Sequence, residues 1–141
     1  MAIAVNRHGI ALLEYSQIPE NQLVSDIYRP LLITFMVIRH EQNFLLVHHR
    51  ERDSWELPGG HIEGTESARD CAARELFEET GQRVDPLEFR AVLKYRAAPD
   101  NRLYYGTLYS GGAFLPCPLP RKRRDITDNV LGREDQHRLH R

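Results

Sequence analysis

The chain has 141 residues, of which 41% are hydrophobic and 28% are charged, and its formal net charge is −1. This composition is typical of one globular domain, and the small net charge gives no global field that would attract a nucleic acid polymer or a membrane surface. The two cysteines, Cys71 and Cys117, lack metal or redox spacing, and Cys71 is expected to be a buried free thiol. No leader pattern or bilayer-spanning run is evident, so we expect a cytoplasmic protein.

Residues 1–29 form an N-terminal segment of mixed character. Residues 3–5 and 10–13 are predicted to be short strands on either side of an Arg7-His8-Gly9 turn. Residues 18–28 are polar and give no clear pattern.

Five further strands are predicted from apolar runs. Residues 31–38 are almost all apolar and rich in branched side chains, which predicts a central strand covered on both faces. Residues 44–48 are expected to pair with this strand as a hairpin, and residues 55–57 form a short third strand. Alternation in residues 87–95 and 103–109 predicts two strands with one wet face. With one helix between them, these strands predict a mixed α/β sheet flanked by helices.

That helix is predicted to lie before Gly81, which suits the left-handed residue that ends a helix. Thr65 is expected to be its N-cap. Glu66 would then place negative charge in the first turn, where the helix dipole favours it.

The same helix carries three glutamates within one and a half turns, namely Glu75, Glu78 and Glu79. Side chains three or four positions apart share one face of a helix, so these carboxylates repel one another. A hard divalent cation with oxygen ligands would relieve this repulsion. Mg²⁺ is suited to such a site because it uses few carboxylates and completes its shell with water and phosphate oxygens.

The glutamates belong to a longer pattern. Gly60 is followed after five residues by Glu66, and seven residues later by the run Arg74-Glu75-Leu76-Phe77-Glu78-Glu79-Thr80-Gly81. This spacing resembles the signature of the Nudix hydrolase family, whose MutT-like members share it. All fixed polar and glycine positions are present, and only Gln82 departs from the usual apolar residue. The resemblance extends more loosely over residues 31–109.

The resemblance implies a Nudix-type α/β/α sandwich with the signature loop-helix motif, with residues 30–115 as its core. It also implies a hydrolase that uses Mg²⁺, or Mn²⁺, to cleave a diphosphate linkage in a nucleoside-diphosphate-type substrate. Glu78 and Glu79 would be the main metal ligands, Glu75 a ligand or the general base, and the carbonyl of Gly60 a further ligand. Arg74 would orient a helix glutamate.

Arg50, Arg52 and Tyr105 are candidates for binding the substrate. Either arginine, just before the motif, would grip a phosphate, and the tyrosine would stack on a base. The alternatives are exposed loop arginines without a ligand and a tyrosine that packs in the core or at its rim.

Residues 116–141 depart from the family pattern. Their prolines and the basic run at 121–124 predict a poorly ordered tail or a short surface helix, with no counterpart of the second helix that many family members carry. Without that helix, apolar surface would be exposed, and a second copy of the chain could cover it. We therefore expect some homodimer.

Two other functions compete with hydrolysis. One is a catalytically silent Nudix-fold module that binds a nucleotide, and the other is the diphosphate isomerase branch of the fold, which needs an additional cysteine and acid. Hydrolysis is favoured because the chain keeps all the signature carboxylates. The expected partner is a small-molecule nucleotide, with neither a membrane nor a nucleic acid polymer.

Overall fold

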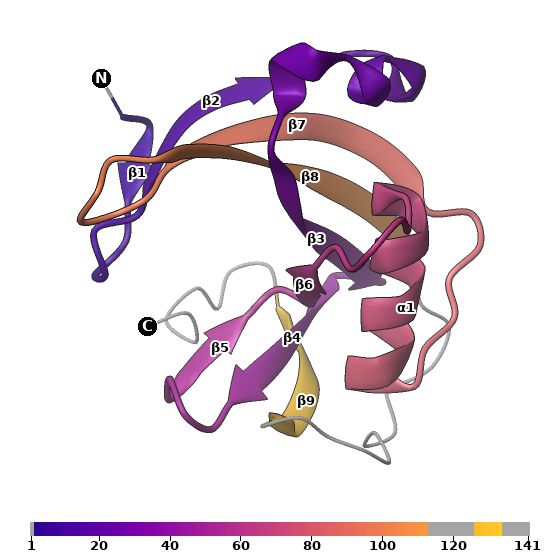
Figure 1. Cartoon of the computed structure of the whole chain (residues 1–141). Helices are drawn as coiled ribbons and strands as arrows, with labels where there is room; N and C mark the ends of the chain where they lie inside the picture. The colour runs from indigo at the N-terminus through magenta and orange to yellow at the C-terminus, as the bar shows by residue number, and fades with distance from the viewer. Residues whose placement is uncertain (1, 113–125, 134–141) are drawn as a thin grey trace.

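The computed structural model describes residues 2–112 and 126–133. Within this part of the chain the elements are, in order, β1 (Ala4–Val5), β2 (Ala11–Ser16), the 3₁₀ helices η1 (Glu20–Val24) and η2 (Asp26–Tyr28), β3 (Leu31–His40), β4 (Asn43–His49), β5 (Ser54–Glu56), β6 (Gly59–His61), α1 (Ala68–Thr80), β7 (Glu88–Arg96), β8 (Leu103–Gly112) and β9 (Ile126–Arg133). Figure 1 shows the strands as one curled sheet with α1 beside it.

The sheet is mixed, as predicted. Its strand order is β1-β2-β7-β8-β3-β4-β5, with β6 paired to β3 and β9 paired to β4. β3 and β8 run parallel, with Thr34 opposite Thr107, whereas the other described pairs are antiparallel. The predicted hairpin of β3 and β4 is present, but their register covers only Arg39↔Phe44 and His40↔Asn43.

Besides β8 and β4, β3 pairs with a third strand along its first half. There β6 pairs with it, from Ile33↔His61 to Phe35↔Gly59. The backbone N–H of Met36 also donates to the carbonyl of Pro58 at 2.9 Å, which fixes the entry to β6. The glycine-rich turn is thus held between the central strand and α1, the element that carries the glutamates (Figure 1).

The hydrophobic core lies between the sheet and α1. Met36 and Ile38 of β3 are fully buried there with Leu76 of α1 and Tyr109 of β8. The intervening β3 residues at 33, 35 and 37 are only half-buried. One face of β3 is therefore fully covered, as predicted, and the other is covered only in part by the residues that the structure describes.

The helix begins later than predicted. Its N-cap is Ser67, whose hydroxyl accepts the backbone N–H of Asp70 at 3.0 Å, so the prediction of Thr65 as the cap was wrong. Glu66 precedes the helix because the N–H of Glu66 closes a turn on the carbonyl of Glu63 at 3.0 Å. The other end is confirmed, because Gly81 has φ 75° and donates to the carbonyl of Phe77 at 2.9 Å.

The N-terminal segment is better ordered than its sequence indicates. The two short strands are confirmed as β1 and β2, and the polar residues that follow contain η1 and η2. Glu20 of η1 accepts two hydrogen bonds from Arg69 of α1, at 3.0 and 2.8 Å, and one from the Tyr109 hydroxyl at 2.8 Å. These charge-assisted bonds fasten the segment to the helix and the core.

The C-terminal region differs from its prediction in one part. Residues 126–133 form β9, which pairs with β4 from His49↔Ile126 to Asn43↔Arg133, so neither a disordered tail nor a surface helix is present there. The outer edge of β4 offers unpaired backbone groups, and this strand satisfies them. The remaining predictions for the tail, at 116–125 and 134–141, lie outside the described residues. In the described part, no helix combines the length and apolarity needed to span a bilayer.

Candidate active site

The signature brings β6 (Gly59–His61), called the glycine strand below, into direct contact with α1, the helix that carries the three glutamates. A Cβ atom added at Gly60 would lie 2.2 Å from the carboxyl carbon and from Oε2 of Glu75. No side chain larger than hydrogen therefore fits at this position unless the Glu75 carboxylate moves. The close approach explains the glycine and places its backbone beside a carboxylate, as the proposed ligand set requires.

The three helix glutamates have different environments. Glu79 is 2% exposed and its Oε1 accepts the backbone N–H of Gly59 at 3.0 Å. Glu75 is 3% exposed, whereas the side chain of Glu78 is 41% exposed. Buried carboxylates are costly unless they are compensated. Glu75 and Glu79, two of the three predicted ligands, are thus buried against the glycine strand, and Glu78 is exposed to solvent.

Arg74 supplies much of that compensation. Its Nε and Nη2 donate to the two carboxylate oxygens of Glu66 at 3.0 and 2.8 Å. Its Nη1 donates to Glu75 at 3.2 Å and to Glu78 at 3.3 Å, and Nη2 also reaches the carbonyl of His61 at 3.2 Å. One guanidinium thus bridges the carboxylates of Glu66, Glu75 and Glu78 and the carbonyl of His61 in β6.

Glu66 is the tightest partner of this arginine. The hydrogen bonds from Arg74 lower the pKa of Glu66 to about 2, and a backbone N–H from Glu63 at 2.9 Å contributes in the same direction. Burial acts oppositely and is outweighed. The same pairing raises the pKa of Arg74. Glu66 is therefore ionised at neutral pH and engaged with Arg74, which is the behaviour of a supporting carboxylate.

The thiol of Cys71 on α1 contacts the backbone of the glycine strand. Its Sγ is 3.4 Å from the carbonyl oxygen of His61 and 3.9 Å from that of Gly60. Burial, followed by the negative charge of Glu66, raises the pKa of the thiol to about 12. Cys71 is a fully buried free cysteine, so the prediction of a buried free thiol is confirmed.

The donor atoms suit a hard cation, although no three His, Cys, Asp or Glu side chains in the described part are already grouped as a metal site. Arg74 lies among the carboxylates of Glu66, Glu75 and Glu78. The available donors are carboxylate oxygens on one helix and a backbone carbonyl on the adjoining strand, which is the oxygen chemistry that Mg²⁺ prefers. The residues fit a divalent cation that would share these carboxylates with the guanidinium.

Arg52, a predicted phosphate ligand, lies in the turn before β5. It donates from Nε and Nη2 to the carboxylate of Glu56 at 2.8 and 2.9 Å, and Ser54 donates to the same carboxylate at 2.5 Å. The pairing with Glu56 raises the pKa of Arg52, and the charge of Glu79 adds to the effect. Burial alone would raise the pKa of Glu56, but these hydrogen bonds lower it. Sequence reasoning missed this pair. The opposite charges of Arg52 and Glu56, four residues apart around the start of a predicted strand, were the available signal.

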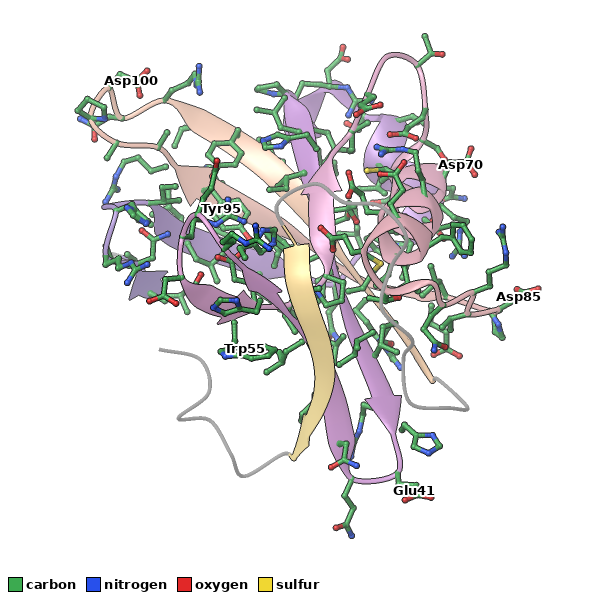
Figure 2. The ribbon with its side chains drawn as sticks, turned by 90° about the horizontal axis from the view of Figure 1, so that it is seen from below. Glu41, Trp55, Asp70, Asp85, Tyr95 and Asp100 are labelled. Atoms are coloured by element: carbon green, nitrogen blue, oxygen red, sulfur yellow. The ribbon has the colours of Figure 1, made fainter. Side chains whose placement is uncertain are left out.

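The other two substrate candidates differ. Arg50 is exposed in the turn after β4. Tyr105 is partly buried against the core and contacts Tyr28 edge to face, with ring centroids 5.8 Å apart, which favours the packing alternative. Tyr104, on the opposite face of β8, stacks on Tyr95 at 5.1 Å (Tyr95 is labelled in Figure 2). Strand alternation separates the two adjacent tyrosines, and that signal was available in the sequence.

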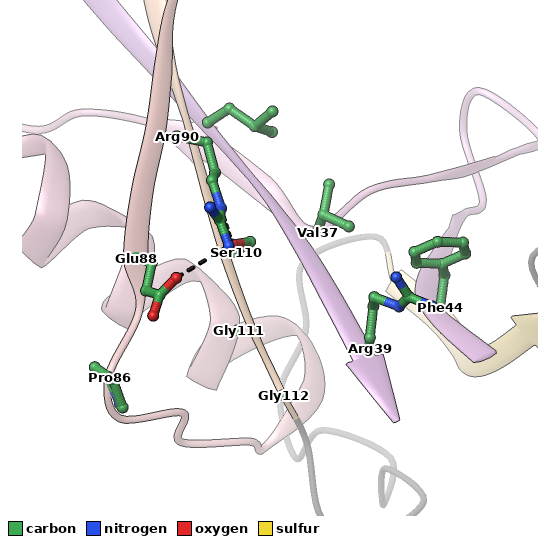
Figure 3. Close-up of a pocket in the computed structure, with 10 residues that line it drawn as sticks. Val37, Arg39, Phe44, Pro86, Glu88, Arg90, Ser110, Gly111 and Gly112 are labelled. Atoms are coloured by element: carbon green, nitrogen blue, oxygen red, sulfur yellow. Dashed lines mark hydrogen bonds and ion pairs between the residues drawn. The ribbon is translucent and has the colours of Figure 1, made fainter. Parts of the chain in front are cut away.

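A cavity of about 620 Å³ lies elsewhere, on the face of the sheet turned away from the core (Figure 3). It is lined by Val37, Arg39, Phe44, Pro86, Glu88, Arg90, Leu108, Ser110, Gly111 and Gly112. Arg90 donates there to Ser110 at 2.6 Å and to Glu88 at 3.0 Å. None of the predicted catalytic, metal or substrate residues lines this cavity, so we assign the candidate site to the signature.

The chain also resembles known proteins. The NUDIX domain model matches residues 30–119. A putative 8-oxo-dGTP diphosphatase of Bacillus subtilis is 27% identical over 118 residues, covering 71% of this chain and 79% of that protein. Phosphatase NudJ of Escherichia coli is 31% identical over 101 residues, and the match covers 70% of this chain but only 65% of NudJ.

The fold has a close counterpart among solved structures. A mutant form of the pyrophosphohydrolase BsRppH from Bacillus subtilis superimposes with a TM-score of 0.73 at 21% identity, covering 93% of this chain and 77% of that one. This likeness supports the mixed-sheet fold described above. Because the family model takes in more than half of the chain, this protein belongs to the NUDIX family.

The family match confirms three predictions, namely the Nudix resemblance, the mixed α/β fold with its loop-helix motif, and the class of Nudix hydrolase. The roles given to individual residues stay predictions.

Proposed function

We propose that this protein is a pyrophosphohydrolase that uses Mg²⁺, or Mn²⁺ in its place, to cleave the diphosphate linkage of a nucleoside triphosphate or an NDP-linked small molecule. The observation that carries the proposal is the contact of two almost fully buried carboxylates, Glu75 and Glu79, with the glycine strand at Gly59 and Gly60. A packing role alone would not select buried charge at this point.

The chain's own residues prepare the site in three ways. The N–H of Gly59 holds one oxygen of Glu79, and the absence of a side chain at Gly60 leaves room for the Glu75 carboxylate. Arg74 fixes the orientation of Glu75 and Glu78. When bound by Glu75, Glu78, Glu79 and the carbonyl of Gly60, the cation would neutralise the diphosphate and activate water. A carboxylate of the same helix would accept the proton of that water.

The substrate class is supported by the names of the relatives and by charge. The Bacillus subtilis relative is described as a diphosphatase of a nucleoside triphosphate, and the structural neighbour as a pyrophosphohydrolase. The charges of Arg52 and Glu79 interact, and Arg52 would bind phosphate groups held at the carboxylates. Arg50, in the same loop, would add a second cation at the entrance.

The setting and the assembly of the protein are also proposed. We propose a cytoplasmic protein that acts on free nucleotides, and a homodimer formed through the half-buried face of β3. Light scattering at high protein concentration tests the dimer, and a mass equal to that of the monomer would refute it.

The test of the function is a substrate panel. Nucleoside triphosphates, nucleoside diphosphates and NDP-sugars are each incubated with the full chain, with Mg²⁺ and with a chelator, and the products are separated by chromatography. We expect cleavage of at least one substrate between two phosphorus atoms, only with the metal. A folded chain that binds a nucleotide tightly but cleaves nothing in the panel would instead support the silent binding module.

A further inference from the structure

The N-terminal hairpin touches the loop that carries Arg52. Arg7, in the turn between β1 and β2, donates from Nη2 to the backbone carbonyl of Arg52 at 2.7 Å. The two residues are 45 positions apart in sequence, and their turns lie on the same side of the molecule in Figure 1. Arg7 lies outside the NUDIX match at residues 30–119, so this contact joins an additional segment of the chain to the candidate site.

The turn that presents Arg7 is itself well fixed. The Oδ1 atom of Asn6 accepts the backbone N–H groups of His8 and Ile10 at 2.9 and 3.0 Å. Gly9 adopts φ +82°, and a Cβ added there would lie 3.1 Å from the Cβ of Ala98 in the β7–β8 loop. Arg7 therefore extends from a turn braced by its own hydrogen bonds and by a neighbouring loop, which lowers the entropy cost of its contact.

The loop that receives Arg7 has an unusual backbone. Asp53, the residue after Arg52, has φ 47°, a left-handed conformation that is uncommon for a residue other than glycine. Its N–H donates to the carbonyl of Arg50 at 3.3 Å, and its carboxylate lies 3.2 Å from Nε2 of His48. Aspartate tolerates this conformation in turns, and the bond from Arg7 is one of the contacts that hold the loop.

The Arg52 side chain binds Glu56, which lies three residues before Gly59, and the N–H of Gly59 binds the buried carboxylate of Glu79. The pKa of Arg52 is raised first by the pair with Glu56 and further by the charge of Glu79. A movement of the Arg52 backbone would therefore move a guanidinium that lies near the candidate active site. The hydrogen bond from Arg7 is to the backbone carbonyl of Arg52, so its effect on the site would pass through the loop.

We propose that Arg7 is a positioning residue for substrate binding, which holds the carbonyl of Arg52 so that the Arg52 guanidinium faces the phosphate groups bound beside Glu79. This inference rests on the proposed function, because it needs a phosphate-bearing substrate at the carboxylates. It makes the N-terminal hairpin part of the binding apparatus of this chain.

A double-mutant cycle tests the inference. R7A, R52A and the double variant are compared with wild type in steady-state hydrolysis of the best substrate of the panel, with R90A as a matched loss of an exposed arginine on the far face. We expect R7A to raise KM about two- to tenfold with kcat nearly unchanged, since one hydrogen bond is lost. R7A should add little in the R52A background, R7K should restore part of the loss, and R90A should behave as wild type.

Hydrogen exchange of the amides at residues 50–54 gives a readout that needs no turnover, and R7A should exchange faster there while R90A should not. The inference is overturned if exchange is unchanged in R7A, if KM is unchanged, or if the effects of R7A and R52A simply multiply. A fall in kcat and melting temperature at constant KM would show a merely structural contact and would also overturn it. Failure of wild type to cleave any substrate would refute the proposed function. The exchange result would still show whether Arg7 holds the loop at residues 50–54.

Discussion

The signature region and the far-face cavity contain the same residue types in contrasting surroundings. Each has a glycine, a glutamate and an arginine: Gly60, Glu79 and Arg74 in the signature, and Gly112, Glu88 and Arg90 at the cavity. Glu79 is 2% exposed, whereas the side chain of Glu88 is 59% exposed. The far-face cavity has an open volume of about 620 Å³, whereas the signature has the buried charge. The comparison teaches that buried carboxylates held by backbone and guanidinium, rather than an open volume, mark the candidate site.

The largest stability difference is expected between the two arginines. R74A leaves Glu66 and Glu75 without their shared partner and should destabilise the fold by about 3 kcal/mol, because partly buried charges lose compensation. R90A breaks an exposed pair and should cost about 0.5 kcal/mol. Urea unfolding measures both. Equal free energies of unfolding for R74A and R90A would contradict the contrast drawn between the signature and the far-face cavity.

The two glycines should differ next. G60A places a methyl group against the Glu75 carboxylate and should lower the rate of hydrolysis about 100-fold, as misplaced catalytic groups do. In G112A the nearest neighbour of the added Cβ is 3.6 Å away, which is ordinary contact, so the rate should stay near that of wild type. Hydrolysis rates on the best substrate provide the measurement. An active G60A enzyme would show that this close approach has no catalytic importance.

A smaller effect should appear in the pH dependence of stability. The folded-state pKa of Glu66 is lowered from 4.5 to about 2, so its stabilising contribution is fully present above pH 4.5 and is lost as the pH falls toward 2. Wild type should therefore lose its stability advantage over E66Q across this window. Thermal unfolding of both proteins at several pH values measures the advantage, and a constant difference would contradict the role given to Arg74.

The smallest effect concerns the start of the helix. S67A removes the hydroxyl that accepts the N–H of Asp70 and should cost about 1 kcal/mol, whereas T65A should be nearly neutral. Chemical denaturation distinguishes the two. A larger cost for T65A would restore the cap predicted from sequence.

Local patterns predicted much of this fold, and long-range contacts supplied what they missed. The apolar run of β3, the left-handed Gly81 and the acidic helix depend on neighbours in sequence, so spacing alone was sufficient. The cap lies at Ser67 rather than Thr65 because the N–H of Glu66 closes a turn on Glu63, while the Glu66 side chain binds Arg74, eight positions away. These contacts of Glu66 are invisible to a capping rule.

The same limit applies to the segments outside the signature. Residues 20–28 appear merely polar, but Glu20 binds Arg69, 49 positions later, and this contact orders η1. Likewise, β9 forms because β4 has a free edge, which no local pattern in residues 126–133 reveals. The predicted carboxylates of the site were brought together by the signature, whereas the Arg52–Glu56 pair and the contact from Arg7 required the folded chain.

The most direct test of the account is Mg²⁺-dependent hydrolysis by E79Q, with E88Q as the matched loss of a carboxylate at the far-face cavity. E79Q keeps the shape of the side chain but removes the buried charge, and we expect its rate to fall by at least about 100-fold with an unchanged circular dichroism spectrum. E88Q should retain wild-type rates. A folded E79Q variant that hydrolyses the substrate as fast as E88Q would contradict the claim that the buried carboxylates of the signature carry the chemistry.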